Sequence, residues 1–253
     1  MGGSGMDGSS GVLEFLATKE GGKSPENLPN PGGLRYGPKD DFSVDCAETP
    51  QIPATFWRVR GKRAFDLAFS AAFLGTVGIW LIPIIGAAIK LDSPGPVFFR
   101  QRRTGLNGQT FTCLKFRTMR HSPGEGFKQA KQNDHRVTRV GRFLRKTNLD
   151  EIPQFINVLL GDMSVVGPRP HVPELDAKFS SYVPGYAQRH LIKPGVTGLA
   201  QVSGCRGETR SVREMRNRVR FDCFYLRNAA FGLDMRIVFW TVSTMLGGDD
   251  RAY

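Results

Sequence analysis

The longest apolar stretch of the chain covers residues 64–89, and Asp66 is the one charged residue inside it. As a straight helix these residues would extend about 39 Å, enough to cross a bilayer. Basic residues flank the stretch on both sides, at positions 58, 60, 62 and 63 before it and 90, 100, 102 and 103 after it. A single span would put one positive cluster on the unfavourable side of the membrane. We therefore expect a re-entrant helix over about 64–90 that enters one leaflet, bends and returns to the same face.

The bend is expected near Pro83, because proline interrupts the helical hydrogen-bond ladder. Gly75 and Gly78 weaken the same helix. The backbone groups freed at the bend need internal partners, and the hydroxyls of Ser70 and Thr76 are the candidates. A buried core helix is the alternative that the pattern leaves open.

Two short runs of alternating apolar and polar residues follow, at 97–103 and 109–119. They predict a β-hairpin around the turn sequence Leu106-Asn107-Gly108. Lys115 and Arg117 would share one face of the second strand. That face is either a phosphate-binding surface or a solvated one. A polar loop is expected over 121–135.

The run KTNLDEIPQFINVLLGDMSVVGPRP at 146–170 combines two adjacent carboxylates, Asp150 and Glu151, with a helix signal. Proline is tolerated in a first helical turn, so Pro153 predicts a helix that begins at about 148–150. Both carboxylates would then lie at the positive end of the helix dipole, which favours their ionised form. Arg145 and Arg169 flank the pair and could bind phosphoryl oxygens. The alternative is an ordinary acidic first turn with solvated arginines.

The last third of the chain predicts two helices, at 210–228 and 229–246. The first carries four arginines that could lie on a membrane surface: Arg213, Arg216, Arg218 and Arg220. The second is amphipathic, and Phe231, Phe239 and Trp240 would serve either as interfacial anchors or as core residues. Asp222 is a further carboxylate candidate, with a structural ion pair as the alternative. Gly195, Gly198 and Gly204 either admit a ligand close to the backbone or form simple turns.

Composition separates an N-terminal leader from a basic domain. Residues 1–55 are rich in Gly, Ser and Pro, lack periodicity, and are expected to be a disordered leader in which 1–5 are a tag remnant. Residues 56–253 hold 31 basic and 15 acidic residues, which implies an anionic partner. Scattered Cys and His residues predict neither a disulfide framework nor a zinc site. No helix-turn-helix, RNP or zinc-finger pattern supports nucleic acid as the partner.

Six blocks, in one order, resemble the bacterial sugar transferase family, the small monotopic phosphoglycosyl transferases. They are KRAFDLAF (62–69), KLDSPGPVFFRQRR (90–103), GQTFTCLKFRTM (108–119), LDEIPQFINVLLGDMSVVGPRP (149–170), KPGVTGLAQVSG (193–204) and FDCFYLRN (221–228). The resemblance covers about residues 60–247. It implies a small mixed α/β catalytic domain over 56–253, with an N-terminal re-entrant membrane helix and amphipathic interfacial helices, on the cytoplasmic face of the bacterial inner membrane.

The resemblance also implies the reaction. Hexose 1-phosphate passes from a UDP-sugar to undecaprenyl phosphate, UMP is released, and polysaccharide repeat-unit synthesis begins. Glucose and galactose are the favoured hexoses. We expect Asp150 to be the nucleophile of a covalent aspartyl-phosphosugar intermediate, Glu151 to assist, and both to bind Mg²⁺. The expected substrate-binding residues are Arg145, Arg169, Lys115, Arg117, Gln201 and Asp222.

Two alternatives remain at this stage. One is a non-catalytic, basic membrane-associated protein that binds polysaccharide or lipid. The other, a nucleic-acid binder, rests on charge alone. A homodimer is left open.

Overall fold

The computed structural model describes residues 60–120, 134–205, 207, 209 and 211–247. The predicted leader over 1–55 and most of the predicted polar loop over 121–135 lie outside these residues. The described part combines helices with two small sheets, so the expected mixed α/β class is confirmed at this level.

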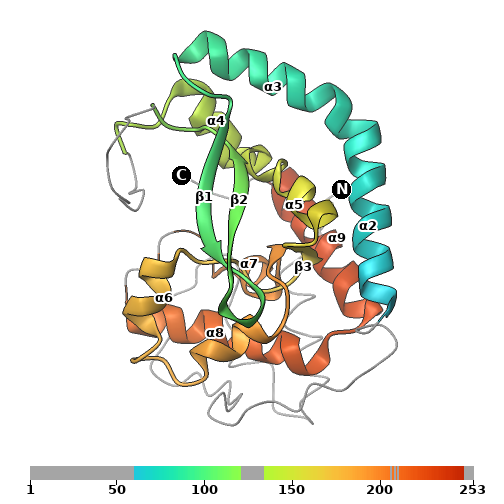
Figure 1. Cartoon of the computed structure of the whole chain (residues 1–253), viewed down its shortest axis with the longest axis vertical. Helices are drawn as coiled ribbons and strands as arrows, with labels where there is room; N and C mark the ends of the chain where they lie inside the picture. Colours follow the sequence, from blue (N-terminus) through green and yellow to red (C-terminus); the bar gives the residue numbers. More distant parts are fainter. Residues whose placement is uncertain (1–59, 121–133, 206, 208, 210, 248–253) are drawn as a thin grey trace, which may run out of the picture.

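Helices make up most of the described structure (Figure 1). They are α2 (Lys62–Phe73), α3 (Ile79–Asp92), α4 (Arg139–Thr147), α5 (Gln154–Leu160), α6 (Pro173–Phe179), α7 (Leu199–Val202), α8 (Val212–Asn228) and α9 (Phe231–Gly247). The predicted hairpin is confirmed: β1 (Phe98–Thr104) pairs antiparallel with β2 (Thr110–Phe116). A second pair is parallel, between β3 (Ser164–Val166) and β4 (Gly195–Thr197).

The apolar stretch forms one bent helical segment, seen in Figure 1 as the arc made by α2 and α3. By length and composition, Lys62–Asp92 could cross a membrane. Its irregular turn is a π-helical segment at Leu74–Gly78, where the Ile79 N–H donates to the Leu74 carbonyl. Such π-turns are a recognised cause of helix bending. The irregularity therefore lies a turn before Pro83, which sits inside α3.

Of the two hydroxyls expected to satisfy freed backbone groups, Thr76 does so and Ser70 does not. The Thr76 hydroxyl donates to the Ala72 carbonyl at 2.7 Å, whereas the buried Ser70 hydroxyl has no hydrogen-bond partner among the described residues. Large apolar side chains on the segment remain exposed, including Ile79, Ile84 and Trp80, the last with 71% of its surface accessible. An apolar surface of this kind is typical of a lipid-facing helix rather than of a core helix.

Both ends of the bent segment are fixed to the rest of the domain. At the first end, the Arg63 guanidinium donates to the Val158 and Leu159 carbonyls at 2.7 and 3.1 Å. These bonds cap the C-terminal end of α5. At the other end, the Asp92 carboxylate accepts the Val140 N–H at 3.1 Å. The two ends of an apolar helix are therefore held by neighbouring parts of one folded unit.

Arg117 belongs to this anchoring system. Its side chain is buried and donates to the Ser93 and Pro94 carbonyls, each at 2.7 Å, and to the Ser93 hydroxyl at 3.0 Å. These carbonyls follow the last turn of α3, where helical backbone acceptors lack intrahelical donors. Arg117 thus has a structural role, the capping of α3, and its expected phosphate-binding role stays a prediction.

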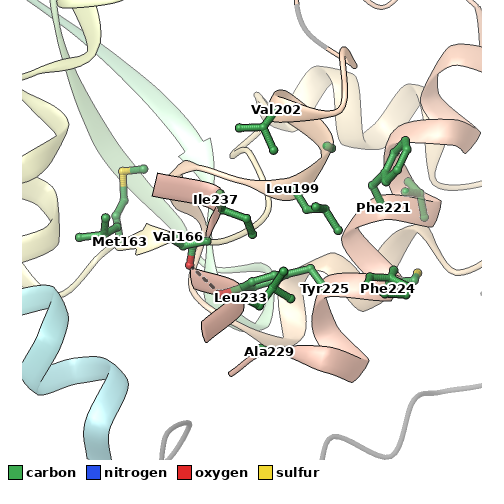
Figure 2. Packing of buried hydrophobic residues seen from close by; sticks show 14 of the residues in the cluster. Met163, Val166, Leu199, Val202, Phe221, Phe224, Tyr225, Ala229, Leu233 and Ile237 are labelled. Atoms are coloured by element: carbon green, nitrogen blue, oxygen red, sulfur yellow. Dashed lines mark hydrogen bonds between the residues drawn. The ribbon is translucent and has the colours of Figure 1, made fainter. Parts of the chain in front are cut away.

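The main core lies where α8 and α9 pack against β3 and α7 (Figure 2). Leu199, Tyr225 and Ile237 are almost fully buried there. The Tyr225 hydroxyl donates to the Val166 carbonyl at 3.2 Å and to the Asp234 carboxylate at 2.7 Å. This core therefore sets the position of β3, the strand that leads into the Gly-Pro-Arg-Pro sequence at 167–170.

The two C-terminal helices are confirmed, with two corrections. Arg218 is buried and does not lie on a surface, unlike the exposed Arg213 and Arg216. The aromatic residues of α9 differ in burial: Trp240 is a core residue, while Phe231 and Phe239 are exposed. The two phenylalanines therefore keep the interfacial role as a prediction.

Candidate functional site

The carboxylate pair lies on a short 3₁₀ turn, Leu149–Glu151, rather than inside an α-helix. Asn148 ends α4 in a left-handed conformation (φ 57°), and α5 begins at Gln154, directly after Pro153. The predicted start of helical structure at 148–150 is therefore correct, but the continuous helix is not. Because both carboxylates precede a seven-residue helix, its dipole is a weak argument for their ionisation.

Asn157 fixes the helix that follows the pair, and the sequence pattern did not single it out. Its amide donates to the Thr112 carbonyl at 2.8 Å, and its side-chain oxygen accepts the Leu114 N–H at 2.9 Å. Asn157 is buried, so these bonds satisfy a polar group that would otherwise destabilise the core. They join α5 to β2 and bring Lys115 beside the carboxylates. An amide within the apolar run FINVLL is the signal that could have found it.

Glu151 is held by two cations from different parts of the chain. Lys115 Nζ donates to Oε1 at 2.7 Å. Arg169 binds the carboxylate in a bidentate manner, with Nη1 at 3.0 Å from Oε2 and Nη2 at 2.5 Å from Oε1. Burial disfavours the ionised form, but the charges and hydrogen bonds of Arg169 and Lys115 hold the Glu151 pKa well below its ordinary value.

Asp150 has the opposite environment. Among the described residues, no hydrogen bond or ion pair engages its carboxylate. Burial, followed by the charge of Glu151, raises the Asp150 pKa to about 6, although Lys115 and Arg145 oppose the shift. The expectation that the helix dipole favours ionisation of both carboxylates is therefore wrong for Asp150. Glu151 is therefore held by two cations, whereas Asp150 has no hydrogen-bond or ion-pair partner among the described residues.

This difference predicts a pH-dependent stability in metal-free buffer. The Asp150 pKa in the folded chain, about 6, exceeds the unfolded value, so the folded state binds the proton more tightly. The wild-type protein therefore loses stability as the pH rises through about 6. We expect Asp150→Asn to melt at least about 2 °C above the wild type at pH 7.5, with the gap narrowing toward pH 5. A gap that does not change with pH would contradict the shifted pKa.

Arg169 is carried by a turn that the two small strands hold in place. The Gly167 N–H donates to the Thr197 carbonyl at 2.9 Å, and the Gly195 N–H donates to the Pro168 carbonyl at 2.9 Å. A Cβ on Gly195 would lie 2.1 Å from the Gly167 nitrogen, and one on Gly198 would lie 2.2 Å from the Gly167 oxygen. Both glycines are therefore required for close backbone packing against the turn, a role that differs from the two predicted for them. Of the three predicted glycines, Gly204 has the positive φ, 85°, that a turn uses.

The other predicted site residues are distributed as follows. Arg145 lies near enough to influence the Asp150 pKa, and its Nε donates to the Thr118 hydroxyl at 2.9 Å. Gln201 is buried in α7, where its amide donates to the Val196 carbonyl at 3.4 Å. Asp222 is buried in α8 and forms an ion pair with Arg189 at 3.0 Å. The structure thus brings Arg145, Lys115 and Arg169 to the carboxylates and gives Asp222 the structural ion pair considered as its alternative.

The donors available for a metal fit a partly solvated, hard cation. No group of three or more His, Cys, Asp or Glu side chains that could hold a metal occurs among the described residues. Mg²⁺ commonly binds through one or two carboxylates and completes its shell with water and substrate phosphate oxygens. Asp150, whose oxygens have no other partner, fits that role, and Glu151 fits it if one of its cations moves away.

The residues of this site lie in a region that matches a known protein family. The family model described as bacterial sugar transferase matches residues 57–248. The chain belongs to this family. The match includes both ends of the bent apolar segment, the carboxylate pair and Arg169, so the residues assembled here all lie within the family's domain.

Curated bacterial sugar transferases include several similar proteins. The chain is 48% identical over 179 residues to "UDP-glucose:undecaprenyl-phosphate glucose-1-phosphate transferase" of Xanthomonas campestris pv. campestris, covering 70% of this chain and 37% of that protein. A protein of the same description from Caulobacter vibrioides is 47% identical over 190 residues, which is 75% of this chain and 71% of the relative. An Aeromonas hydrophila "UDP-N-acetylgalactosamine-undecaprenyl-phosphate N-acetylgalactosaminephosphotransferase" is 44% identical over 161 residues, or 63% and 38% of the two chains. The chain spans less than two fifths of the Xanthomonas and Aeromonas proteins.

Proposed function

We propose that the chain transfers glucose 1-phosphate from UDP-glucose to undecaprenyl phosphate, with UMP as the leaving group. The proposal rests on the different environments of the two adjacent carboxylates. Glu151 is neutralised by Lys115 and Arg169, whereas Asp150 is unbonded beside the same cations. A free carboxylate next to positive charge is suited to attack an anionic phosphorus, since the cations offset the repulsion.

The reaction proceeds in two displacements. An Asp150 carboxylate oxygen bonds to the sugar-bearing phosphorus, the bond from that phosphorus to the bridging oxygen breaks, and UMP leaves with the electron pair. A phosphate oxygen of undecaprenyl phosphate then bonds to the same phosphorus, and the Asp150 carboxylate is released. Arg169, Lys115 and Arg145 orient the phosphoryl oxygens. Mg²⁺, when bound, supplies further neutralisation of phosphate charge.

The choice of glucose rests on the relatives. Proteins described as glucose-1-phosphate transferases are 48% and 47% identical to the chain, whereas the relative described as an N-acetylgalactosaminephosphotransferase is 44% identical. The reaction class, transfer of a sugar phosphate to undecaprenyl phosphate, is common to all three names, whereas the sugar differs among them. The sequence favoured galactose as well as glucose, so UDP-galactose is one of the donors in the experiment described next.

A panel of UDP-sugars tests the function directly. Purified protein with Mg²⁺ and undecaprenyl phosphate should release UMP from UDP-glucose and form a lipid-linked product. UDP-galactose and UDP-N-acetylgalactosamine serve as the comparison donors. A protein that binds the lipid without releasing UMP from any donor would support the alternative of a non-catalytic membrane-associated binder.

The proposal includes a re-entrant topology, with the domain on the cytoplasmic face of the inner membrane. Arg63 at one end of the bent segment and Asp92 at the other both contact the folded domain. A helix that crossed the bilayer would leave its two ends on opposite sides, about 30 Å of hydrocarbon apart. Contacts from both ends to one domain support entry and exit on the same side. There the site lies at the level of the lipid phosphate.

We expect single cysteines at Arg60 and Lys90, both exposed positions, to react with an impermeant thiol reagent only from the cytoplasmic side. The wild-type chain, in which Cys113 and Cys223 are buried and Cys205 is partly exposed, measures the background labelling. Labelling of either position from the periplasm would show a full span. In the same assay, Pro83→Leu should leave the topology unchanged, because the π-turn at Leu74–Gly78 precedes it.

A further inference from the structure

Helix α4 has two faces of different chemistry. Leu144 is buried in a cluster that includes Ile85 and Ile89 of α3, so this side of α4 packs against the bent segment. The opposite side is exposed and carries Arg139, Arg142, Phe143 and Lys146. These four positions are three or four residues apart, so they share one face of the helix. We call them the α4 outer face.

The three basic side chains of the α4 outer face have no partner among the described residues. No ion pair or side-chain hydrogen bond there involves Arg139, Arg142 or Lys146. The sequence holds no acidic residue between positions 139 and 149. The Asp92 carboxylate, at the start of α4, accepts the Val140 N–H at 3.1 Å. The face therefore carries more positive charge than this neighbouring acid can offset, which favours an anionic partner.

The helix lies where the bent apolar segment ends. It is next to the last turns of α3 (Figure 1), and the bond from the Val140 N–H to Asp92 joins the two. Trp80, Ile84 and Leu91 follow one another at spacings of four and seven residues and are all exposed, the last with 89% of its surface accessible. A lipid-facing stripe on α3 therefore continues to its final turn. The headgroups that surround this end of α3 lie at the level of α4.

We propose that the α4 outer face binds anionic phospholipid headgroups of the leaflet that the bent segment enters. Arg139, Arg142 and Lys146 contact lipid phosphates, and Phe143 lies at the boundary between headgroups and acyl chains. Each basic side chain near an anionic bilayer surface adds to the attraction, which predicts selectivity for anionic over zwitterionic lipid. The inference goes beyond the proposed transfer reaction, since it concerns the bilayer itself and requires no turnover.

The length of the face favours bilayer phospholipids over a single acceptor lipid. Arg139 and Lys146 are seven residues apart, which is about 10 Å along a helix. The face is therefore long enough for more than one headgroup. Undecaprenyl phosphate carries the same phosphate chemistry, so the experiment includes it as a competitor.

Photocrosslinking of the full chain in nanodiscs tests this surface. The nanodiscs consist of phosphatidylcholine with a trace of photoreactive phosphatidylglycerol or, separately, of photoreactive phosphatidylcholine, and mass spectrometry locates the adducts. In the wild type, we expect α4 to crosslink the anionic probe at least about five-fold more than the zwitterionic probe. The stripe around Trp80 and Ile84 should crosslink both about equally. High salt should reduce the preference at α4, because it screens exposed charges.

Two matched double variants localise the effect. Arg142→Gln with Lys146→Gln removes two charges, four residues apart, from the α4 outer face, and glutamine is a good helix former. Arg216→Gln with Arg220→Gln removes two charges at the same spacing from α8, which lies away from α3 (Figure 1). We expect the α4 pair to lower the yield of phosphatidylglycerol adducts at α4 about five-fold. The α8 pair should leave this yield within about two-fold of the wild type.

Three results would overturn the proposal. Equal yields of the two probes at α4 would leave the face to another partner, such as an acidic protein. An equal loss in the two double variants would indicate a general effect of net charge. Stronger competition by undecaprenyl phosphate than by the same amount of unlabelled phosphatidylglycerol would assign the face to the acceptor lipid.

These outcomes are independent of the proposed reaction, because no sugar donor is present. The predicted crosslinks in a chain that releases no UMP from UDP-glucose would refute the transferase function and keep the lipid surface. Transfer of glucose phosphate by a chain without selective crosslinks at α4 would do the reverse. If the α4 pair does not fold, as judged by thermal melting, Arg142→Gln alone replaces it, with an expected loss of at least about two-fold.

Discussion

Replacement of Asp150 by Asn should reduce formation of the lipid-linked product by on the order of 10³-fold or more, the size of effect seen when a covalent nucleophile is removed. The amide occupies the same space but has no charged oxygen that can bond to phosphorus. Asp150 engages no other described side chain, so its substitution breaks no hydrogen bond or ion pair that holds the fold. The measurement is transfer of label from UDP-glucose to undecaprenyl phosphate in membranes or detergent.

The control for this variant is a carboxylate of the same domain that lies away from the pair. Glu174 is exposed on α6 and forms no ion pair among the described residues. Glu174→Gln should keep activity within about two-fold, because exposed substitutions of this kind have small effects. Near-wild-type transfer by Asp150→Asn would show that another group attacks the phosphorus, or that the acceptor attacks directly.

A covalent adduct provides the second measurement of the same prediction. Incubation with UDP-glucose and Mg²⁺, without the lipid, should release at most one UMP per active site. The peptide that contains Asp150 should gain the mass of one hexose phosphate, and the gain should disappear when undecaprenyl phosphate is added. Asp150→Asn should show neither event. Kinetics in which both substrates must bind before UMP leaves would instead favour direct transfer and leave Asp150 as a metal ligand.

The sequence predicted the elements well where local chemistry determines them. The hairpin around Leu106-Asn107-Gly108 follows from alternation and a turn, and the break in the apolar helix follows from its glycines. The exact place of the break did not follow. Pro83 is the stronger local signal, but the π-turn at Leu74–Gly78 carries the irregularity and the Thr76 hydroxyl satisfies a carbonyl beside it.

The site was predictable as a set of residues but not as a set of roles. Adjacent carboxylates and flanking arginines marked the place, yet Lys115 and Arg117 are two positions apart in one run and have different partners. Lys115 reaches Glu151, whereas Arg117 caps α3. The difference arises from contacts with distant segments, which no periodicity in a single run can report.

The separation of Asp150 from Glu151 also depends on long-range contacts. In sequence the two are neighbours with the same charge, and a helix dipole would treat them alike. In the fold, Asn157 binds β2 and so sets where Lys115 lies, while β3 and β4 hold the turn that carries Arg169. Both cations reach Glu151, and the remaining carboxylate is left with a raised pKa.

The second large effect is expected at Glu151. Glu151→Gln should reduce kcat by on the order of 10²-fold, because an amide neither neutralises Lys115 nor holds Arg169 in its bidentate geometry. The same substitution should strengthen the binding of inorganic phosphate in Mg²⁺-free buffer by several-fold. The reason is competition: in the structure, the Glu151 oxygens occupy the donors that would otherwise bind phosphate.

The two effects of Glu151→Gln, lower kcat and higher phosphate affinity, distinguish three possible roles of this residue. A residue that acts only as a metal ligand would leave phosphate affinity unchanged without Mg²⁺ and would raise the Mg²⁺ concentration needed for turnover. A residue that only holds Arg169 in place would weaken phosphate binding when removed, since the guanidinium would lose its fixed position. The role expected here is a third one, in which Glu151 binds Lys115 and Arg169 until a substrate phosphate displaces it. This role predicts that Glu151→Gln turns over more slowly and binds inorganic phosphate more tightly. Titration of inorganic phosphate against the wild type, Glu151→Gln and the Glu174→Gln control decides among the three.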